Sequence, residues 1–445
     1  MKKDDFVSGL IISREHRFAF SLQNFRVTIF CIENDKTKIV IEPDDNGYIW
    51  GKTSDNRCIA IYVGERFGIV NTRVVNTWNY IISQHQIEKE EMNSFSGIRF
   101  VNGAVKTVFP CGAIEEKKEI EKELIKQKKE CLFVYGIIDD LLEFDSFDSI
   151  SPVKWKYFSV VNQGGIINNS DSHLEILFEK PRAIKSFYDY YGYVSTVHEF
   201  LVFRRNVYFE KVILFNTIDD YQEELADCYV KPPESVENRD FYHSIYVRLA
   251  DKDEFQNIIR NAISADEKKE YLPSEIIPRD EKDFGIITGE KIWCLCSAIE
   301  KELDISGIHL TKTESMNELI NQVKDVVKKH RKGNSPLPMK TYDRVFGSIS
   351  HWNDSLSDRI EKVWEENFNE LEPLFSFYGV EKEYIDIKKL VKKRNSITHE
   401  GFKEIDNQEF YTYLFLKGLL YSLTLKRIGM DSDKIKGIME RRFIG

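Results

Sequence analysis

The chain has 445 residues and a mass of 52.3 kDa, which is enough for two or three hydrophobic cores. Hydrophobic residues make up 42% and aromatic residues 13% of the chain, so the composition excludes a largely disordered protein. The formal net charge of −10 argues against wholesale coating of nucleic acid. Residues 281–445 carry a net charge of about zero, so the negative excess lies in residues 1–280, and a local basic surface near the C-terminus remains compatible with the composition.

The sequence shows no sign of a membrane segment or a bound cofactor. No apolar stretch approaches the ~20 residues of a membrane span, and the start, MKKDDFVSGLIIS, has too short an apolar core for a signal peptide. We therefore expect a cytoplasmic protein with no membrane partner. The seven cysteines form no disulfide framework, and neither they nor the histidines have the spacing of metal ligands. The sequence implies no metal and no other cofactor.

Residues 1–264 are predicted to be rich in β-strands. Segments with many Ile, Val, Phe and Tyr residues are separated by turns that contain Asn, Asp and Gly. Between them, residues 114–130 form a dense run of Glu and Lys, which is most simply an exposed helix inserted between strands. The aromatic stretch 184–203 fits a helix or a strand equally well by periodicity.

The second part of the chain is predicted to be helical. The polar segment 265–284 contains two prolines and predicts a linker. Beyond it, apolar residues recur at helical spacing in segments 288–304, 315–332, 356–379, 383–401 and 407–429. The last segment is apolar enough for a central helix. The sequence therefore predicts an α+β multidomain protein, with a β-rich N-terminal region followed by an all-α bundle at residues 285–445.

The stretch 385–402, IDIKKLVKKRNSITHEGF, places Arg394, Asn395 and His399 on one predicted amphipathic helix. Arginine stays charged and binds phosphate through its planar fork, whereas histidine titrates near neutral pH. Asn395 and His399 are one turn apart on one face. Arg394 and His399 are about 140° apart around the helix, so a single helix cannot aim both at one atom. Two copies of the helix that face each other would bring them together.

The string RNSITH has the form R-N-x-x-x-H and resembles the R-x4-6-H motif of the HEPN superfamily, whose helical domains include many metal-independent ribonucleases. Arg344 and His351 also satisfy R-x6-H, but no Asn follows the Arg and Gly347 lies between them. The whole chain resembles ApeA-type proteins of bacterial anti-phage defence. The resemblance implies a homodimer whose two motifs meet in a cleft, and an acidic partner for the motif on the first helix, for which Glu300 is the candidate.

RNA carries its own nucleophile, the 2′-hydroxyl group, so its cleavage needs proton transfer and stabilisation of a dianionic phosphorane. His399 is the candidate for proton transfer and Arg394 for transition-state stabilisation, while Asn395 could hold either the imidazole or the phosphate. The candidates for RNA binding are Lys388, Lys389, Lys392 and Lys393. A second basic run covers residues 324–332, and for both runs the alternative is a solvated helix face.

From these observations we expect a metal-independent HEPN endoribonuclease of bacterial abortive infection, with tRNA or mRNA as its substrate. It would work as a homodimer or a larger assembly, and a phage-derived trigger would act on residues 1–264. The main alternative is a non-catalytic HEPN-type module that binds RNA or a protein. A third alternative is an unrelated hydrolase with Cys111 as its nucleophile, although no partner residue is evident for it.

Overall fold

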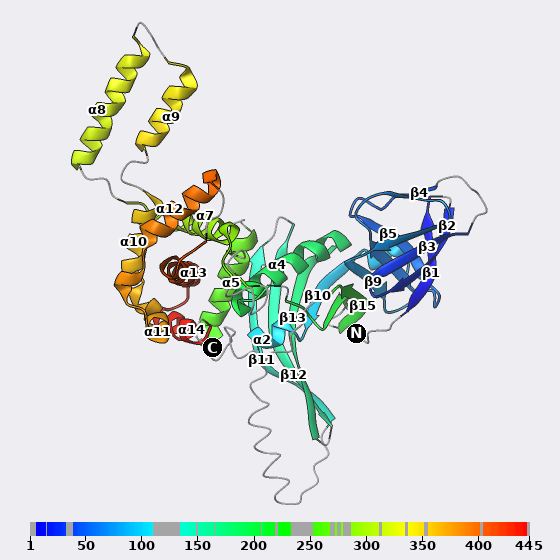
Figure 1. Cartoon of the computed structure of the whole chain (residues 1–445). Coiled ribbons are helices and arrows are strands. Elements are labelled where there is room, and N and C mark those ends of the chain that lie inside the picture. Colours follow the sequence, from blue (N-terminus) through cyan, green and yellow to red (C-terminus); the bar gives the residue numbers. More distant parts are fainter. Residues whose placement is uncertain are drawn as a thin grey trace, which may run out of the picture. The chain divides into compact units, whose positions relative to one another are not determined.

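The computed structural model describes most of the chain, which separates into two compact units, residues 1–267 and 268–445 (Figure 1). The described residues are 6–14, 16–32, 39–109, 134–147, 150–164, 166–205, 207–218, 221–232, 252–267, 272–273, 277–278, 286–310, 314–333, 337–350, 355–400 and 404–442. The expected α+β organisation is confirmed, because antiparallel strands dominate the first unit and helices make up the second. The charged segment 114–130, predicted to be helical, and Cys111 lie outside the described residues.

The first unit is built on one large antiparallel sheet. Its strands are β1 (Val7–Ser13), β2 (His16–Gln23), β3 (Arg26–Cys31), β5 (Tyr48–Thr53), β6 (Cys58–Tyr62), β8 (Thr72–Asn76), β9 (Asn79–Ser83), β10 (Phe95–Val101), β11 (Val134–Phe147), β12 (Pro152–Gly164), β13 (Ile166–Arg182), β14 (Lys211–Ile218) and β15 (Tyr221–Val230). They are ordered β11-β12-β13-β10-β14-β15-β9-β6-β5-β1-β2-β3-β8, and β4 (Ile39–Ile41) pairs separately with β7 (Phe67–Ile69). The alternation of buried and outward residues along β2 follows the two-residue period of a strand.

Four described helices accompany the sheet of the first unit: α1 (Lys89–Met92), α2 (Ala104–Val108), α4 (Ile184–Val202) and α5 (Lys252–Glu267). The stretch that fitted a helix or a strand equally well forms α4, which buries Phe187, Val194 and Leu201 along one face. Helix α5 was not predicted, and its last three residues occupy the start of the predicted linker. The β-rich region therefore ends in a helix that belongs to the same compact unit.

The second unit surrounds one central helix, α13 (Asn407–Arg427), as Figure 1 shows. The other helices are α7 (Gly289–Ile305), α8 (Glu314–Arg331), α9 (Met339–Ser350), α10 (Leu356–Glu366), α11 (Phe368–Tyr378), α12 (Ile387–Glu400) and α14 (Ser432–Arg442), with a 3-10 turn at Lys382–Tyr384. Helix α13 is buried continuously from Thr412 to Leu425 and contacts α7, α11, α12 and α14. Its apolar sequence on all sides is explained by these neighbours.

The prediction of a single helix at residues 356–379 is wrong, because the chain forms two helices that meet at Asn367. The Asn367 side-chain amide donates to the backbone carbonyl of Val363 at 2.6 Å, and the Asn367 backbone departs from helical geometry at φ −114°. Asparagine competes with the backbone for hydrogen bonds in this way, which makes it a frequent end point of helices. Helices α9 and α14 were also not predicted.

Helices α7 and α13 are joined by a buried ion pair. Arg427 donates to both carboxylate oxygens of Glu302, at 2.6 and 3.1 Å, and Glu302 also accepts from the Thr424 hydroxyl at 3.2 Å. The Glu302 side chain is fully buried, whereas that of Arg427 is 13% exposed. A carboxylate removed from water needs such partners, so this pair fixes how α7 lies on α13.

We expect Glu302→Gln to destabilise the second unit by about 3 kcal/mol, because it leaves the Arg427 guanidinium without its compensating charge. Urea unfolding of the full chain, followed through the transition of the helical unit, measures this loss. Glu365→Gln is the matched control, since the Glu365–Lys382 pair is at the surface and contributes at most about 1 kcal/mol. Equal losses for the two variants would contradict a structural role for Glu302.

Candidate functional site

Helix α12 carries the Arg–Asn–His motif, and the predicted helix at this stretch is confirmed. Asp386 caps its first turn by accepting from the Lys389 backbone N–H at 2.8 Å, while the Asp386 N–H donates to the Thr412 hydroxyl of α13 at 3.1 Å. Ile387 and Leu390 are buried beneath the helix. The motif is therefore presented by a helix whose start and inner face are both attached to the bundle.

Two lysines of α12 hold the helix to the N-terminus of α13. Asp406 and Glu409 form a capping box at that end of α13. Lys389 contacts the Asp406 carboxylate at 2.5 Å, and this hydrogen bond raises the pKa of Lys389 and lowers that of Asp406. One turn later, Lys393 contacts the Glu409 carboxylate at 3.2 Å and donates to the backbone carbonyl of Glu404 at 2.7 Å.

The predicted RNA-binding lysines thus have different surroundings. Lys389 and Lys393 contact the capping box of α13, and Lys388 lies 3.1 Å from the Glu361 carboxylate of α10. Among the described side chains, no ion pair involves Lys392, which is exposed. Three of the four lysines therefore stabilise the position of α12, and Lys392 is the one best placed to meet an anion in solvent.

The Arg394 side chain extends from α12 to α7. Its guanidinium group is 3.3 Å from the Glu300 carboxylate and 3.4 Å from the Asn395 side-chain oxygen. The Arg394 and Glu300 side chains are 23% and 44% exposed. A partly exposed ion pair at this distance contributes at most about 1 kcal/mol to the stability of the fold. A phosphate group could therefore replace the Glu300 carboxylate on Arg394 at small cost, and the structure brings together the three predicted site residues Arg394, Asn395 and Glu300.

A buried thiol lies one turn before Glu300 on α7. Burial raises the pKa of Cys296 to about 12, and the positive charge of Arg394 opposes this shift. The thiol therefore stays protonated at neutral pH, and it packs as an apolar side chain rather than acting as a nucleophile. Among the described residues, no group of three His, Cys, Asp or Glu side chains is arranged to hold a metal ion.

His399 lies near the end of α12, but its side chain is outside the described part of the structure. By helical register, position 399 follows Asn395 by one turn on the same face, on which Lys392 also lies. Arg394 projects about 100° away from Asn395. Of the second R-x6-H string, Arg344 is exposed on α9, whereas His351 is not among the described residues.

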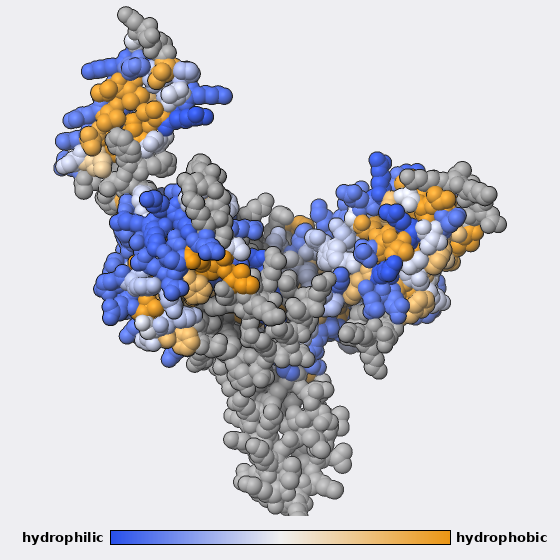
Figure 2. All heavy atoms as spheres, viewed as in Figure 1, coloured by the Kyte–Doolittle hydropathy of each residue, from blue (hydrophilic) through white to orange (hydrophobic). Residues whose placement is uncertain are grey.

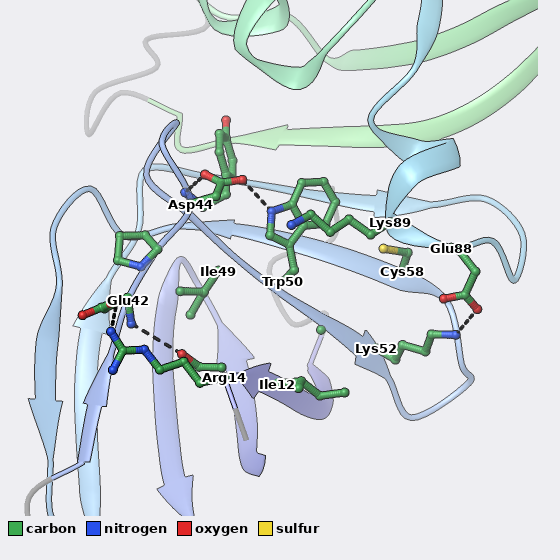
Figure 3. Close-up of a pocket in the computed structure, with 14 residues that line it drawn as sticks. Ile12, Arg14, Glu42, Asp44, Ile49, Trp50, Lys52, Cys58, Glu88 and Lys89 are labelled. Carbon is green, nitrogen blue, oxygen red and sulfur yellow. Dashed lines mark hydrogen bonds and ion pairs between the residues drawn. The ribbon is translucent and has the colours of Figure 1, made fainter. Parts of the chain in front are cut away.

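A separate pocket of about 470 Å³ lies in the first unit, where β1, β5 and β6 meet the start of α1 (Figure 3). In this pocket, the Trp50 indole N–H donates to the Asp44 carboxylate at 2.7 Å. The Lys89 ammonium group lies over the Trp50 ring, 4.9 Å from the ring centre. The other basic residues that line the pocket are Arg14, which pairs with Glu42, and Lys52, which pairs with Glu88. Local sequence patterns did not predict this pocket, because its lining comes from five separate stretches of the chain.

Comparisons with known proteins do not identify a family: no family model, curated protein or solved structure matches the chain. No helix among the described residues is long and apolar enough to cross a membrane.

We expect Lys393→Met to loosen α12, because the buried Glu409 carboxylate loses its charged partner while the apolar stem of the side chain is kept. Amide hydrogen exchange in α12 should accelerate about tenfold or more, corresponding to a loss of about 1.4 kcal/mol or more in opening free energy. Lys392→Met is the matched control on the same helix and should leave the exchange unchanged. Similar exchange in both variants would show that Lys393 does not hold the helix.

Proposed function

We propose that the protein is a metal-independent endoribonuclease of the HEPN type that acts in the bacterial cytoplasm in defence against phage. The observation that carries the proposal is the setting of Arg394, which lies beside Asn395 and forms an ion pair with the partly exposed Glu300. A buried structural arginine has a different setting, as Arg427 shows on the same bundle. The charge of Arg394 is close to solvent and is held in place by neighbouring helices.

In the proposed reaction, the 2′-hydroxyl oxygen of RNA attacks the adjacent phosphorus, and the bond from phosphorus to the 5′-oxygen breaks. His399 moves a proton, either from the 2′-hydroxyl group or to the leaving 5′-oxygen. Arg394 stabilises the negative charge of the phosphorane through its two-pronged guanidinium group. Asn395 orients the imidazole or the phosphate, and Lys392 binds the RNA backbone. The products are a 2′,3′-cyclic phosphate and a 5′-hydroxyl group.

Arg394 and position 399 diverge around α12, so the proposed active form is a dimer in which two α12 helices contribute to one cleft. Its substrate is tRNA or mRNA, which every infected cell contains. The proposal assigns the response to a phage-derived trigger to residues 1–267. Deletion of these residues should then abolish protection or its dependence on infection, and unchanged triggered protection would contradict this assignment.

We expect Arg394→Ala and His399→Ala each to reduce cleavage of total cellular RNA at least a hundredfold, because each removes a proposed transition-state contact. The measurement uses purified full-length protein in excess EDTA, and the same variants are expressed in phage-challenged cells. Glu300→Gln should keep activity, since the ion pair to Arg394 is not part of the reaction.

Arg344→Ala is the matched control, because Arg344 is an exposed arginine of the same unit outside the motif. It should cleave RNA and protect cells as the wild type does. If the Arg394 and His399 variants also behave as the wild type, the nuclease proposal is wrong. If the wild type binds RNA without cutting it, the alternative of a non-catalytic binding module is favoured.

A further inference from the structure

Helix α7 presents one aromatic ring to solvent. Trp293 is 47% exposed, whereas the other tryptophans that the structure describes are buried or half-buried. The helix itself is firmly placed, because Ile292, Leu295 and Ile299 are fully buried in the bundle. The exposed ring is therefore carried by a helix whose inner face is packed.

Trp293 lies on the same side of α7 as Glu300, the residue that contacts Arg394. The two positions are seven residues apart, which is about two turns, or roughly 10 Å along the helix axis. Cys296 lies between them, where burial raises the pKa of its thiol and the charge of Arg394 opposes the shift. The Trp293 indole and the Arg394 guanidinium group therefore share one edge of α7, and one short stretch of a bound chain can contact both.

The surroundings of Trp293 favour a single planar ring, rather than a protein surface, as its partner. On α7 it is the only exposed large apolar residue, and no exposed apolar residue lies on the described part of α12. Figure 2 shows that hydrophilic side chains predominate over α10 and α12. The core of a protein interface is built from several apolar residues together. Proteins that bind single-stranded nucleic acid instead combine aromatic rings, on which bases stack, with cations that contact the backbone.

We propose that a base of the RNA stacks on Trp293 while an adjoining phosphate group binds Arg394. The inference rests on the proposed function, because it takes Arg394 as the residue that binds phosphate. Neighbouring bases cover both faces of a base inside a duplex, so the base that stacks on the indole is unpaired and turned outward. Trp293 thus contributes a contact to the base, in addition to the backbone contacts, and holds the RNA in position for the cut.

Binding of a labelled single-stranded oligoribonucleotide to the full-length His399→Ala chain measures this contact without cleavage. We expect Trp293→Ala in that chain to weaken binding at least about fivefold, and Trp293→Phe, which keeps a ring, to weaken it less. Phe377→Ala is the matched control, because Phe377 is an exposed ring of the same unit that lies on α11, and it should leave the affinity unchanged.

A set of oligoribonucleotides, each with one abasic nucleotide, separates stacking from a general change of the surface. One abasic position should weaken binding to the chain that retains Trp293 but have no further effect on the Trp293→Ala chain, because the ring that met the missing base is already absent. Unchanged affinity of the Trp293→Ala chain, or equal losses for both chains at every abasic position, would overturn the inference. A lower mass of the Trp293→Ala chain in sedimentation would also overturn it, by assigning the indole to a contact between copies.

The binding test and the cleavage test can fail separately. If the wild type cuts RNA and Trp293→Ala changes neither binding nor cleavage, this inference is wrong and the nuclease proposal stands. If RNA binds through Trp293 and stays uncut by the wild type, the nuclease proposal is wrong and the base contact stands.

Discussion

The arrangement of the second unit depends on how the N-terminus of α13 holds α12. The first turn of a helix has backbone N–H groups without partners inside the helix, and the capping box of Asp406 and Glu409 satisfies two of them. The same two carboxylates accept Lys389 and Lys393 from α12, which are one turn apart. The capping box at the start of α13 therefore also sets the position of the preceding helix, α12, and with it the place of Arg394.

Two glutamates of α7 show how one helix serves both stability and the proposed chemistry. Glu302 is fully buried and binds Arg427 through both of its oxygens, so the pair is part of the core. Glu300 precedes it by two residues, which turns its side chain to another face, and there it meets Arg394 close to solvent. The buried pair cannot be opened without a large loss of stability, whereas the partly exposed pair contributes at most about 1 kcal/mol to stability. Of these two arginines, Arg394 is therefore the one that we propose to bind a phosphate.

The sequence was sufficient for the features that depend on short-range periodicity. Apolar spacing predicted α12 and α13, and a strongly apolar segment predicted the central helix. The break at Asn367 was missed because the periodic pattern continues through it, whereas the contact from the Asn367 side chain to the Val363 carbonyl at the helix end depends on the folded geometry. The sequence predicted one basic surface for the lysines of α12, because the partners of Lys388, Lys389 and Lys393 lie 16 to 27 residues away in the chain. Asp406 and Glu409 are 17 and 16 residues from Lys389 and Lys393.

In the proposed mechanism, the RNA supplies its own nucleophile, and α12 supplies the positive charge and the group that transfers the proton. The most direct test uses an oligoribonucleotide cut by the wild type at a mapped position, and a second one with a single 2′-deoxy nucleotide at that position, both in excess EDTA. We expect the first to be cut to a 2′,3′-cyclic phosphate and a 5′-hydroxyl end, whereas the second stays intact. Cleavage of the deoxy substrate at the same position would contradict it, because no 2′-hydroxyl group is then present to attack.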